Sequence, residues 1–244
     1  MFKTFFATSA AVLIAMTGCK STDCCGTCSA GETTALAVDA QAQWTVLFDG
    51  SSTEHFRGYK LEGMPDQGWV IEGDALHIKP KSRVPDLITK EKYSDFDLRF
   101  EWKVSSGANS GIMYRVAEGK GAAYFTGPEY QILEDSNHGD GKNPKTSSGA
   151  LYALVPCNDK KTLKPVGEWN TTRIVIEDNK VQHWLNGEKV VSYEWASDEI
   201  KGLIANSKFK KWERFMTQDT GHIAFQNHND AVWFRNIKIK DLSK

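Results

Sequence analysis

The sequence predicts an all-β protein, a two-sheet antiparallel sandwich with one short helix. Short runs rich in β-branched and aromatic residues recur through residues 43–244, and turn-forming pairs of Gly, Asn and Asp separate them. The stretch "SDEIKGLIANS" places its apolar residues at helical spacing. Many short strands joined by turns are typical of two antiparallel sheets packed face to face.

The first half of the domain contains a series of short strands. "WTVLFDG" ends in an Asp-Gly turn, and "WVIEGDALHI" is expected to form a hairpin around Gly73. "FDLRFEWKV" alternates apolar and charged residues, which is the pattern of a strand with one buried face and one solvated face. Three further strands are expected in "SGIMYRV", "EYQIL" and "ALYALV".

The second half adds a meander, a helix and a final hairpin. In "TRIVIEDNKVQHWLNGEKVVSYEW" the turns Asp178-Asn179 and Asn186-Gly187 separate three antiparallel strands. Ser197 or Asp198 can cap the helix that follows. "GHIAFQNH" and "AVWFRNIKIKDL" are expected to end the chain as another hairpin.

The N-terminal segment differs from the rest of the chain. "MFKTFFATSAAVLIAMTGC" has an early lysine, a short apolar run and small residues before Cys19, which predicts a signal peptide over residues 1–18. Met-Thr-Gly-Cys resembles a bacterial lipobox, so Cys19 is the expected lipidation site and residues 19–42 a lipid-anchored tether; plain secretion is the alternative. The expected location is the bacterial cell envelope, periplasmic or cell-surface, with the lipid anchor as the only membrane contact.

Composition excludes one class of partner. The 244 residues carry a net charge of -1, and Lys and Arg are interspersed with Asp and Glu. A protein that binds nucleic acid is expected to show a basic stripe, which this pattern lacks. Cys24, Cys25 and Cys28 lack the second Cys/His pair of a zinc site, so oxidisable thiols in the tether are the simpler interpretation.

Polar side chains interrupt a strand that otherwise has core composition. In "GPEYQILED" a period of two places Glu129 and Gln131 on one face and Tyr130 and Ile132 on the other. One face is therefore apolar and the other carries groups able to bind a ligand.

Other strands carry further candidate residues. Arg115 in "ANSGIMYR" could bind a sugar oxygen or stabilise developing negative charge, or be a solvated surface charge. His183 and His228 are candidate proton-transfer groups, although a histidine among apolar residues is more often a satisfied core residue. Gln226 shares a face with His228, and the alternating charges of "FDLRFEWKV" are explained by solvent exposure alone.

The order of motifs along residues 44–242 is itself specific. The motifs are "WTVLFDG", "DLITKEKYSDFDLRFEWKV", "GANSGIMYR", "GPEYQILED", "GEWNTTRIVIEDNKVQHWLNGEKV", "SKF" and "GHIAFQNHNDAVWFRNIKI". Together they resemble the 3-keto-disaccharide hydrolase family. The resemblance implies a concanavalin A-like jelly roll with a ligand cleft on a concave face, and glycosides already oxidised to a ketone at C3 as substrates. Two departures occur: His228-Asn229-Asp230 stands where a His-Gly pair is usual, and the loop after Asp135 is long.

The resemblance also implies that the candidate site residues lie together in the ligand cleft. The expected catalytic residues converge in one cleft and are Glu129, Arg115, His183 and His228. The expected substrate-binding residues are Gln131, Gln226, Glu101, Lys103 and Lys208 of "SKF". The expected partner is a small carbohydrate, and the sequence leaves the oligomeric state open.

A ketone at C3 suggests how such a cleft would work. It acidifies the C2 proton, so an enzyme can expel the C1 substituent by elimination and then add water. Glu129 or a histidine is the expected base, Arg115 the partner of the enolate, and His183 or His228 the acid. No cofactor is required by this route; a divalent metal ion is compatible with it, but no ligand spacing demands one.

Two other functions fit the same fold. The spacing Glu129-x-Gln131-x-x-Glu134 is that of retaining glucanases, which use two carboxylates. Gln131 cannot supply the charge of their middle aspartate, and strict alternation would turn Glu134 away from Glu129 unless a bulge intervenes. The remaining alternative is a non-catalytic carbohydrate-binding module.

Overall fold

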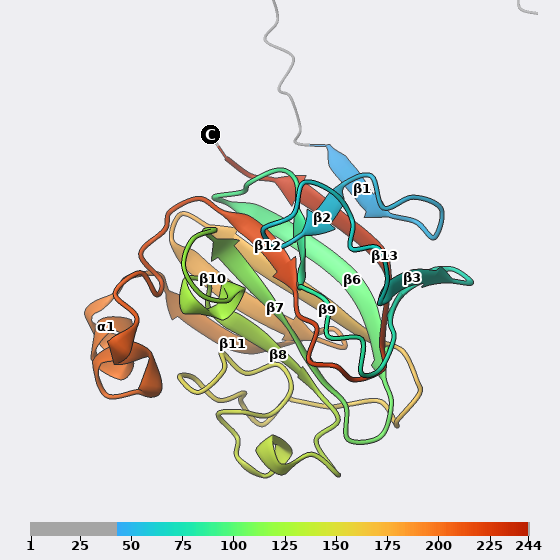
Figure 1. Cartoon of the computed structure of the whole chain (residues 1–244). Coiled ribbons are helices and arrows are strands. Elements are labelled where there is room, and N and C mark those ends of the chain that lie inside the picture. The colour runs from blue at the N-terminus through green and yellow to red at the C-terminus, as the bar shows by residue number, and fades with distance from the viewer. Residues whose placement is uncertain (1–42, 244) are drawn as a thin grey trace, which may run out of the picture. The chain divides into compact units, whose positions relative to one another are not determined.

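The computed structural model describes residues 43–243, which form two antiparallel sheets that face each other (Figure 1). The all-β prediction is therefore confirmed. The predicted signal peptide (1–18) and lipidated tether (19–42) lie outside the described residues. Among residues 43–243, no helix is long and apolar enough to span a membrane.

The larger sheet has eight strands in the order β11-β10-β9-β6-β13-β4-β3, with β1 also paired to β13. Its strands are β1 (Trp44–Phe48), β3 (Trp69–Glu72), β4 (Ala75–Ile78), β6 (Phe96–Val104), β9 (Asn170–Glu177), β10 (Lys180–Leu185), β11 (Glu188–Glu194) and β13 (Val232–Asp241). The predicted hairpin β3-β4 and the meander β9-β10-β11 both belong to this sheet.

The smaller sheet has five strands in the order β2-β5-β12-β7-β8. Its strands are β2 (Phe56–Gly58), β5 (Leu87–Thr89), β7 (Asn109–Val116), β8 (Glu129–Leu133) and β12 (His222–Phe225). One α-helix, α1 (Asp198–Ala205), begins after the predicted cap Ser197, whose hydroxyl accepts from the Ile200 N–H at 3.3 Å. Three short 3₁₀ helices complete the described elements: η1 (Ala123–Phe125), η2 (Gly139–Lys142) and η3 (Lys208–Lys211).

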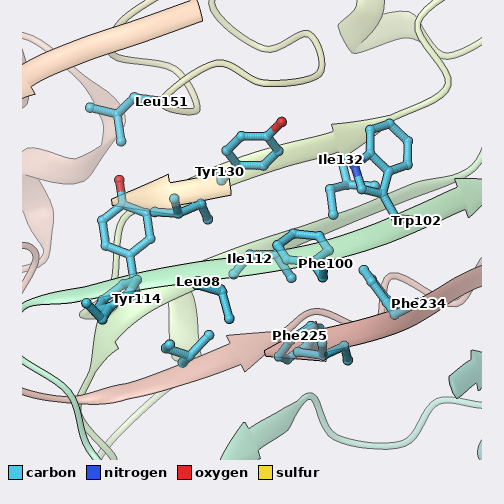
Figure 2. Packing of buried hydrophobic residues seen from close by; sticks show 14 of the residues in the cluster. Leu98, Phe100, Trp102, Ile112, Tyr114, Tyr130, Ile132, Leu151, Phe225 and Phe234 are labelled. Carbon is cyan, nitrogen blue, oxygen red and sulfur yellow. The ribbon is translucent and has the colours of Figure 1, made fainter. Parts of the chain in front are cut away.

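The core fills the space between the sheets (Figure 2). Strand β6 contributes Leu98, Phe100 and Trp102, the apolar positions of its alternating pattern. From the smaller sheet, Tyr114 and Tyr130 point into the same layer, and both are fully buried. Because inward residues alternate with outward ones, each sheet keeps a second face whose side chains point away from this core.

Two predicted elements are wrong. "ALYALV" forms a tight turn instead of a strand: Ala153 has a left-handed φ of 59°, and the Leu151 N–H donates to the Val155 carbonyl at 3.0 Å. The expected C-terminal hairpin does not form, because β12 pairs with β5 and β7 while β13 pairs with β4, β6 and β1. The loop that follows Phe225 carries the chain from one sheet to the other.

Candidate active site

Four strands of the smaller sheet align a row of polar positions on the sheet's outer face. The Gln226 N–H donates to the Gly111 carbonyl at 2.9 Å, and Gly111 pairs with Gln131 on β8. At the other end, Asp86 directly precedes β5 and accepts a 2.9 Å hydrogen bond from the Asn227 N–H. The register thus places Asp86, Gln226, Gly111 and Gln131 side by side across the sheet.

Glu129 lies over the middle of this row. A Cβ atom on Gly111 would overlap the Oε1 atom of Glu129, so the glycine leaves the space that the carboxyl group occupies. Glu129 is only 9% exposed, yet its carboxyl group accepts no hydrogen bond from another described residue. Burial raises the pKa of Glu129 to about 8; the charge of Lys208 opposes this shift, whereas Asp86 and Asp140 add to it.

Asp86 is a second carboxyl group on the same face, which the sequence analysis did not identify. Burial raises its pKa to about 6, against the hydrogen bond from Asn227 and the charge of His228. Asp86 directly precedes β5, a strand that was not predicted from the sequence, and alternation from Ile88 places its side chain on the outer face. The site therefore contains two carboxyl groups with different raised pKa values, a pattern typical of acid and base pairs.

Two buried amide oxygens on the same face have no partner. Asn109 and Gln226 are 7% and 9% exposed, and neither Asn109 Oδ1 nor Gln226 Oε1 has a hydrogen-bond donor among the described residues. Buried polar atoms normally have a partner, so such atoms at a surface row are suited to bind the hydroxyl groups of a ligand. Glu129, Asn109 and Gln226 together offer several acceptors to one molecule.

Lys208 and His228 lie at the edges of this site. The Lys208 ammonium lies 4.3 Å from the centre of the Tyr152 ring and interacts electrostatically with Glu129 and Asp140. His228 is half-exposed, with Nδ1 3.4 Å from the Asp230 carboxylate. Both side chains are therefore able to approach a ligand bound over Glu129.

Gln131 lies on the predicted face, but its side chain holds a loop. Its Nε2 donates to the Thr146 carbonyl at 3.0 Å, and its Oε1 accepts from the Ile132 N–H at 3.1 Å. The side chain is nearly fully buried. These contacts assign Gln131 to positioning the loop that carries Tyr152, and they oppose the predicted direct role in substrate binding.

The predicted convergence fails for Arg115. Its Nε donates to the Ser94 carbonyl at 3.1 Å, its Nη2 to Asp95 at 3.2 Å, and its guanidinium stacks on Trp195 at 4.5 Å. An extra residue on β7, between the positions paired with His222 and Ala224, forms a β-bulge, and Arg115 adopts a φ of 50°. The bulge breaks the alternation that would have aimed Arg115 at Glu129.

The prediction is also wrong for His183. It is fully buried between the sheets, where Nε2 lies 2.9 Å from the Tyr114 hydroxyl and Nδ1 lies 3.0 Å from the Gly149 carbonyl. Burial lowers its pKa to about 4, although the hydrogen bond to Gly149 opposes this shift. His183 is thus a core histidine with both ring nitrogens satisfied, the alternative role for a histidine among apolar residues.

Glu101 and Lys103 belong to the other sheet. Both project from the outer face of β6, where Glu101 accepts from Arg235 Nε at 2.8 Å and Lys103 stacks on Trp169 and Trp233. The sandwich lies between these side chains and Glu129, so the prediction that they share its cleft is wrong.

Glu134 does not form a carboxylate pair with Glu129. Strand β8 ends at Leu133, and the Glu134 carboxylate accepts from the N–H groups of Gly107, Ser136 and Asn137. Burial would raise its pKa, but these donors lower it. The arrangement expected of a retaining glucanase is absent from residues 43–243, and this part of the chain also holds no cluster of three metal-binding side chains.

Comparisons with known proteins agree with the fold and the motif order. Residues 43–240 match the 3-keto-alpha-glucoside-1,2-lyase-like domain. A 3-keto-disaccharide hydrolase of Bacteroides thetaiotaomicron is 34% identical over 237 residues, which cover 85% of this chain and 81% of that protein.

Solved structures give the same result. A candidate glycosyl hydrolase of Parabacteroides distasonis is 32% identical, with a TM-score of 0.74 over 82% of this chain and 94% of that one. A second from that organism is 26% identical, with a TM-score of 0.63 over 82% of this chain and 100% of that one. A galectin-like protein of Bacillus subtilis, 10% identical with a TM-score of 0.53, shares the fold alone. The chain belongs to the 3-keto-alpha-glucoside-1,2-lyase-like family and is a glycoside-cleaving enzyme.

Proposed function

We propose that the chain cleaves glycosides that carry a ketone at C3, by removing the C2 proton, expelling the C1 substituent and adding water. The observation that carries this proposal is the carboxyl group of Glu129 on the outer face of the smaller sheet, which is buried, accepts no hydrogen bond from another described residue and interacts electrostatically with Lys208. A carboxylate with a raised pKa is a stronger base than an ordinary one.

Glu129 is the proposed base. In its ionised form it takes the C2 proton, and the electrons of the C–H bond delocalise onto the C3 oxygen as an enolate. Lys208 is the cation that stabilises this oxygen, in the place that the sequence analysis gave to Arg115.

The second step breaks the C1–O bond. The enolate re-forms the ketone, a C1–C2 double bond forms, and the leaving oxygen takes a proton from the Asp86 and His228 pair, which interact electrostatically. Water then adds to C1 and a proton returns to C2, which completes hydrolysis. The acceptors of Asn109 and Gln226 bind sugar hydroxyl groups and orient the ring.

Matched variants test this assignment. Glu129→Gln should lower kcat/KM on a 3-keto glucoside by about 100-fold or more, because general base catalysis contributes roughly 10²- to 10⁴-fold. Lys208→Met should lower kcat by about 100-fold, the effect of losing one electrostatic stabiliser. As controls, Glu101→Gln and Lys103→Met make the same two kinds of substitution on the opposite sheet, and both variants should remain active.

The substrate comparison separates the alternatives. The 3-keto glucoside should be cleaved and its unoxidised parent should not. Cleavage of the parent would contradict the proposal in favour of an ordinary glycosidase, and inertness toward both would favour a binding module. Turnover should persist after dialysis against a chelator, since base, cation and acid are all side chains; loss of turnover that a divalent ion restores would contradict the cofactor-free route.

We also propose that Cys19 is acylated and that the enzyme is anchored in the bacterial cell envelope by this lipid. The proposal rests on the sequence around Cys19, since residues 1–42 lie outside the described part of the chain. Cys19→Ala should move the protein from the membrane fraction to the soluble fraction. A wild-type protein already soluble, with a different mature N-terminus, would contradict the anchor.

A further inference from the structure

The outer face of the larger sheet carries an unusual row of like charges. Strand register places Arg173 of β9 opposite Arg99 of β6, and Arg99 opposite Lys238 of β13. We call these three residues the cation row. Like charges directly opposite each other on neighbouring strands destabilise a sheet, so three in succession call for a compensating group.

The compensation within the described residues is incomplete. The Asp97 carboxylate accepts from the Nε and Nη2 groups of both Arg99 and Arg173 at 2.8–3.1 Å. Burial would raise the pKa of Asp97, but the two guanidinium groups lower it, so it supplies one full negative charge. One carboxylate against three cations leaves the cation row positive. Two further carboxylates line the groove: Glu101 is paired with Arg235, whereas Asp49, at the Val46 end, accepts only from Ser51 among the described residues and keeps its negative charge.

The arginines keep donors for a ligand. Neither Nη1 of Arg99 nor Nη1 of Arg173 donates to another described residue, and their side chains are 43% and 36% exposed. The shared Asp97 fixes both guanidinium planes, because each is held through two nitrogen atoms. Two preoriented guanidinium groups with free donors are well suited to bind carboxylate or sulfate oxygens.

A cavity and two tryptophans surround the cation row. A cavity of about 710 Å³ on this face is lined by the cation row, with Trp184 at one end and Val46 of β1 at the other. Trp184 pairs with Arg173 across the strands, and Trp44 lies under the side chains of Arg99 and Lys238. Strands lie about 4.8 Å apart, so the three cations span about 10 Å, roughly the length of a disaccharide.

We propose that this groove is a second carbohydrate-binding site, on the opposite face from Glu129, and that it takes a linear glycan carrying carboxylate or sulfate groups. The cation row binds the anionic groups, and Trp184 packs against a sugar ring at the end of the row. The donors are the fixed, forked guanidinium groups of Arg99 and Arg173, and they lie in a groove. This geometry suits the separate anionic groups of a glycan chain better than the flat, diffuse charge of a lipid surface.

Binding measurements on the full chain test the proposal. An oligogalacturonate and a sulfated oligosaccharide should bind, a neutral cello-oligosaccharide of equal length should not, and affinity should fall as salt is raised. Lys238→Gln, which breaks no ion pair, and Trp184→Ala should each weaken binding by about three- to tenfold. Lys160→Gln, an exposed lysine outside the groove, should not change binding.

The same variants distinguish this site from the catalytic one. Turnover of a 3-keto glucoside should be unchanged in Lys238→Gln and Trp184→Ala, and a saturating acidic oligosaccharide should not inhibit it. Equal binding of neutral and acidic glycans, absence of binding to both, or binding only to vesicles of phosphatidylglycerol would each overturn the proposal. Binding of only the carboxylated or only the sulfated glycan would support it and identify the anion.

Discussion

The carboxyl group of Glu129 is held where ionisation is unfavourable. Alternation along "EYQIL" correctly predicts that it faces away from the core. Its burial, and the lack of a hydrogen-bond donor among the described residues, could not be predicted, because its surroundings include Gly111 and Lys208, which are distant in the chain. The surroundings of Asp86 likewise come from a distant segment, the loop that follows β12.

Glu129→Gln is expected to stabilise the protein increasingly as pH rises. The pKa of Glu129 is about 8 in the folded state and 4.5 as its ordinary value. Between these values the unfolded chain loses a proton that the folded protein keeps, so wild-type stability falls as pH rises through this window. The variant should melt above wild type, by a margin that grows from pH 4.5 to 8. Each kcal/mol of difference in unfolding free energy should shift the melting temperature by about 2–4 °C.

Glu134→Gln is the matched control, with the opposite sign. Despite its burial, backbone donors lower the pKa of Glu134, so its ionised form stabilises the fold and the variant should melt below wild type at neutral pH. A Glu129→Gln variant that melts lower than wild type at pH 8 would contradict the unfavourable burial of Glu129.

In strand β7, the alternation of inward and outward side chains predicts side-chain direction only as far as the β-bulge. Its regular part places Asn109, Gly111 and Met113 outward, as the pattern predicts. The bulge beyond Met113 turns Arg115 toward Trp195, and nothing in "SGIMYRV" marks the extra residue. The element was therefore predictable from sequence, whereas the direction of its most strongly charged side chain was not.

Arg115→Met is expected to affect stability and not catalysis. The change leaves Asp95 without its cation and removes the hydrogen bond to Ser94, which should cost about 2–4 kcal/mol of unfolding free energy. Values of kcat per folded molecule should stay within about threefold of wild type, a difference of less than about 1 kcal/mol. Denaturant titration and turnover at a permissive temperature measure the two effects, and a 100-fold loss of kcat in a folded variant would restore Arg115 to the active site.

Gly111→Ala, by contrast, is expected to affect catalysis. The added Cβ overlaps the carboxyl group of Glu129 and must displace it, so turnover should fall at least about tenfold, as small misplacements of catalytic groups do. Gly202→Ala, in α1 where nothing beyond the adjacent residues and the helix's own backbone lies within 4 Å of the new Cβ, should keep full activity and gain about 0.5–1 kcal/mol in stability. Full activity in Gly111→Ala would contradict the position of Glu129.

At the scale of the whole molecule, the sandwich has two outward faces, and sequence does not say which strands share one. The alternation of "FDLRFEWKV" correctly places Glu101 outward, but only the pairing of β6 with β9 and β13 shows that this is the face opposite Glu129. Strand pairing joins segments far apart in the chain, so it follows from the packed core and not from a local pattern. The sequence thus predicted two sheets and many of the polar residues, but not their division between the two faces.

The histidine between the sheets is expected to make the fold sensitive to acid. Burial gives His183 a pKa of about 4, below its ordinary 6.5, so its contribution to stability is complete above pH 6.5 and is lost as pH falls through 4. The difference in unfolding free energy between wild type and His183→Gln should therefore narrow over this range, as urea titrations at several pH values would show. A constant difference would mean that His183 is not neutral in the fold.

Deuterium incorporation at C2 tests the central claim most directly. Wild-type enzyme acting on a 3-keto glucoside in D₂O should give a 3-keto sugar labelled at C2 faster than an enzyme-free control, and Glu129→Gln should slow both labelling and cleavage by about 100-fold or more. Cleavage without label at C2, or label and cleavage undiminished in Glu129→Gln, would contradict an elimination in which Glu129 removes the C2 proton.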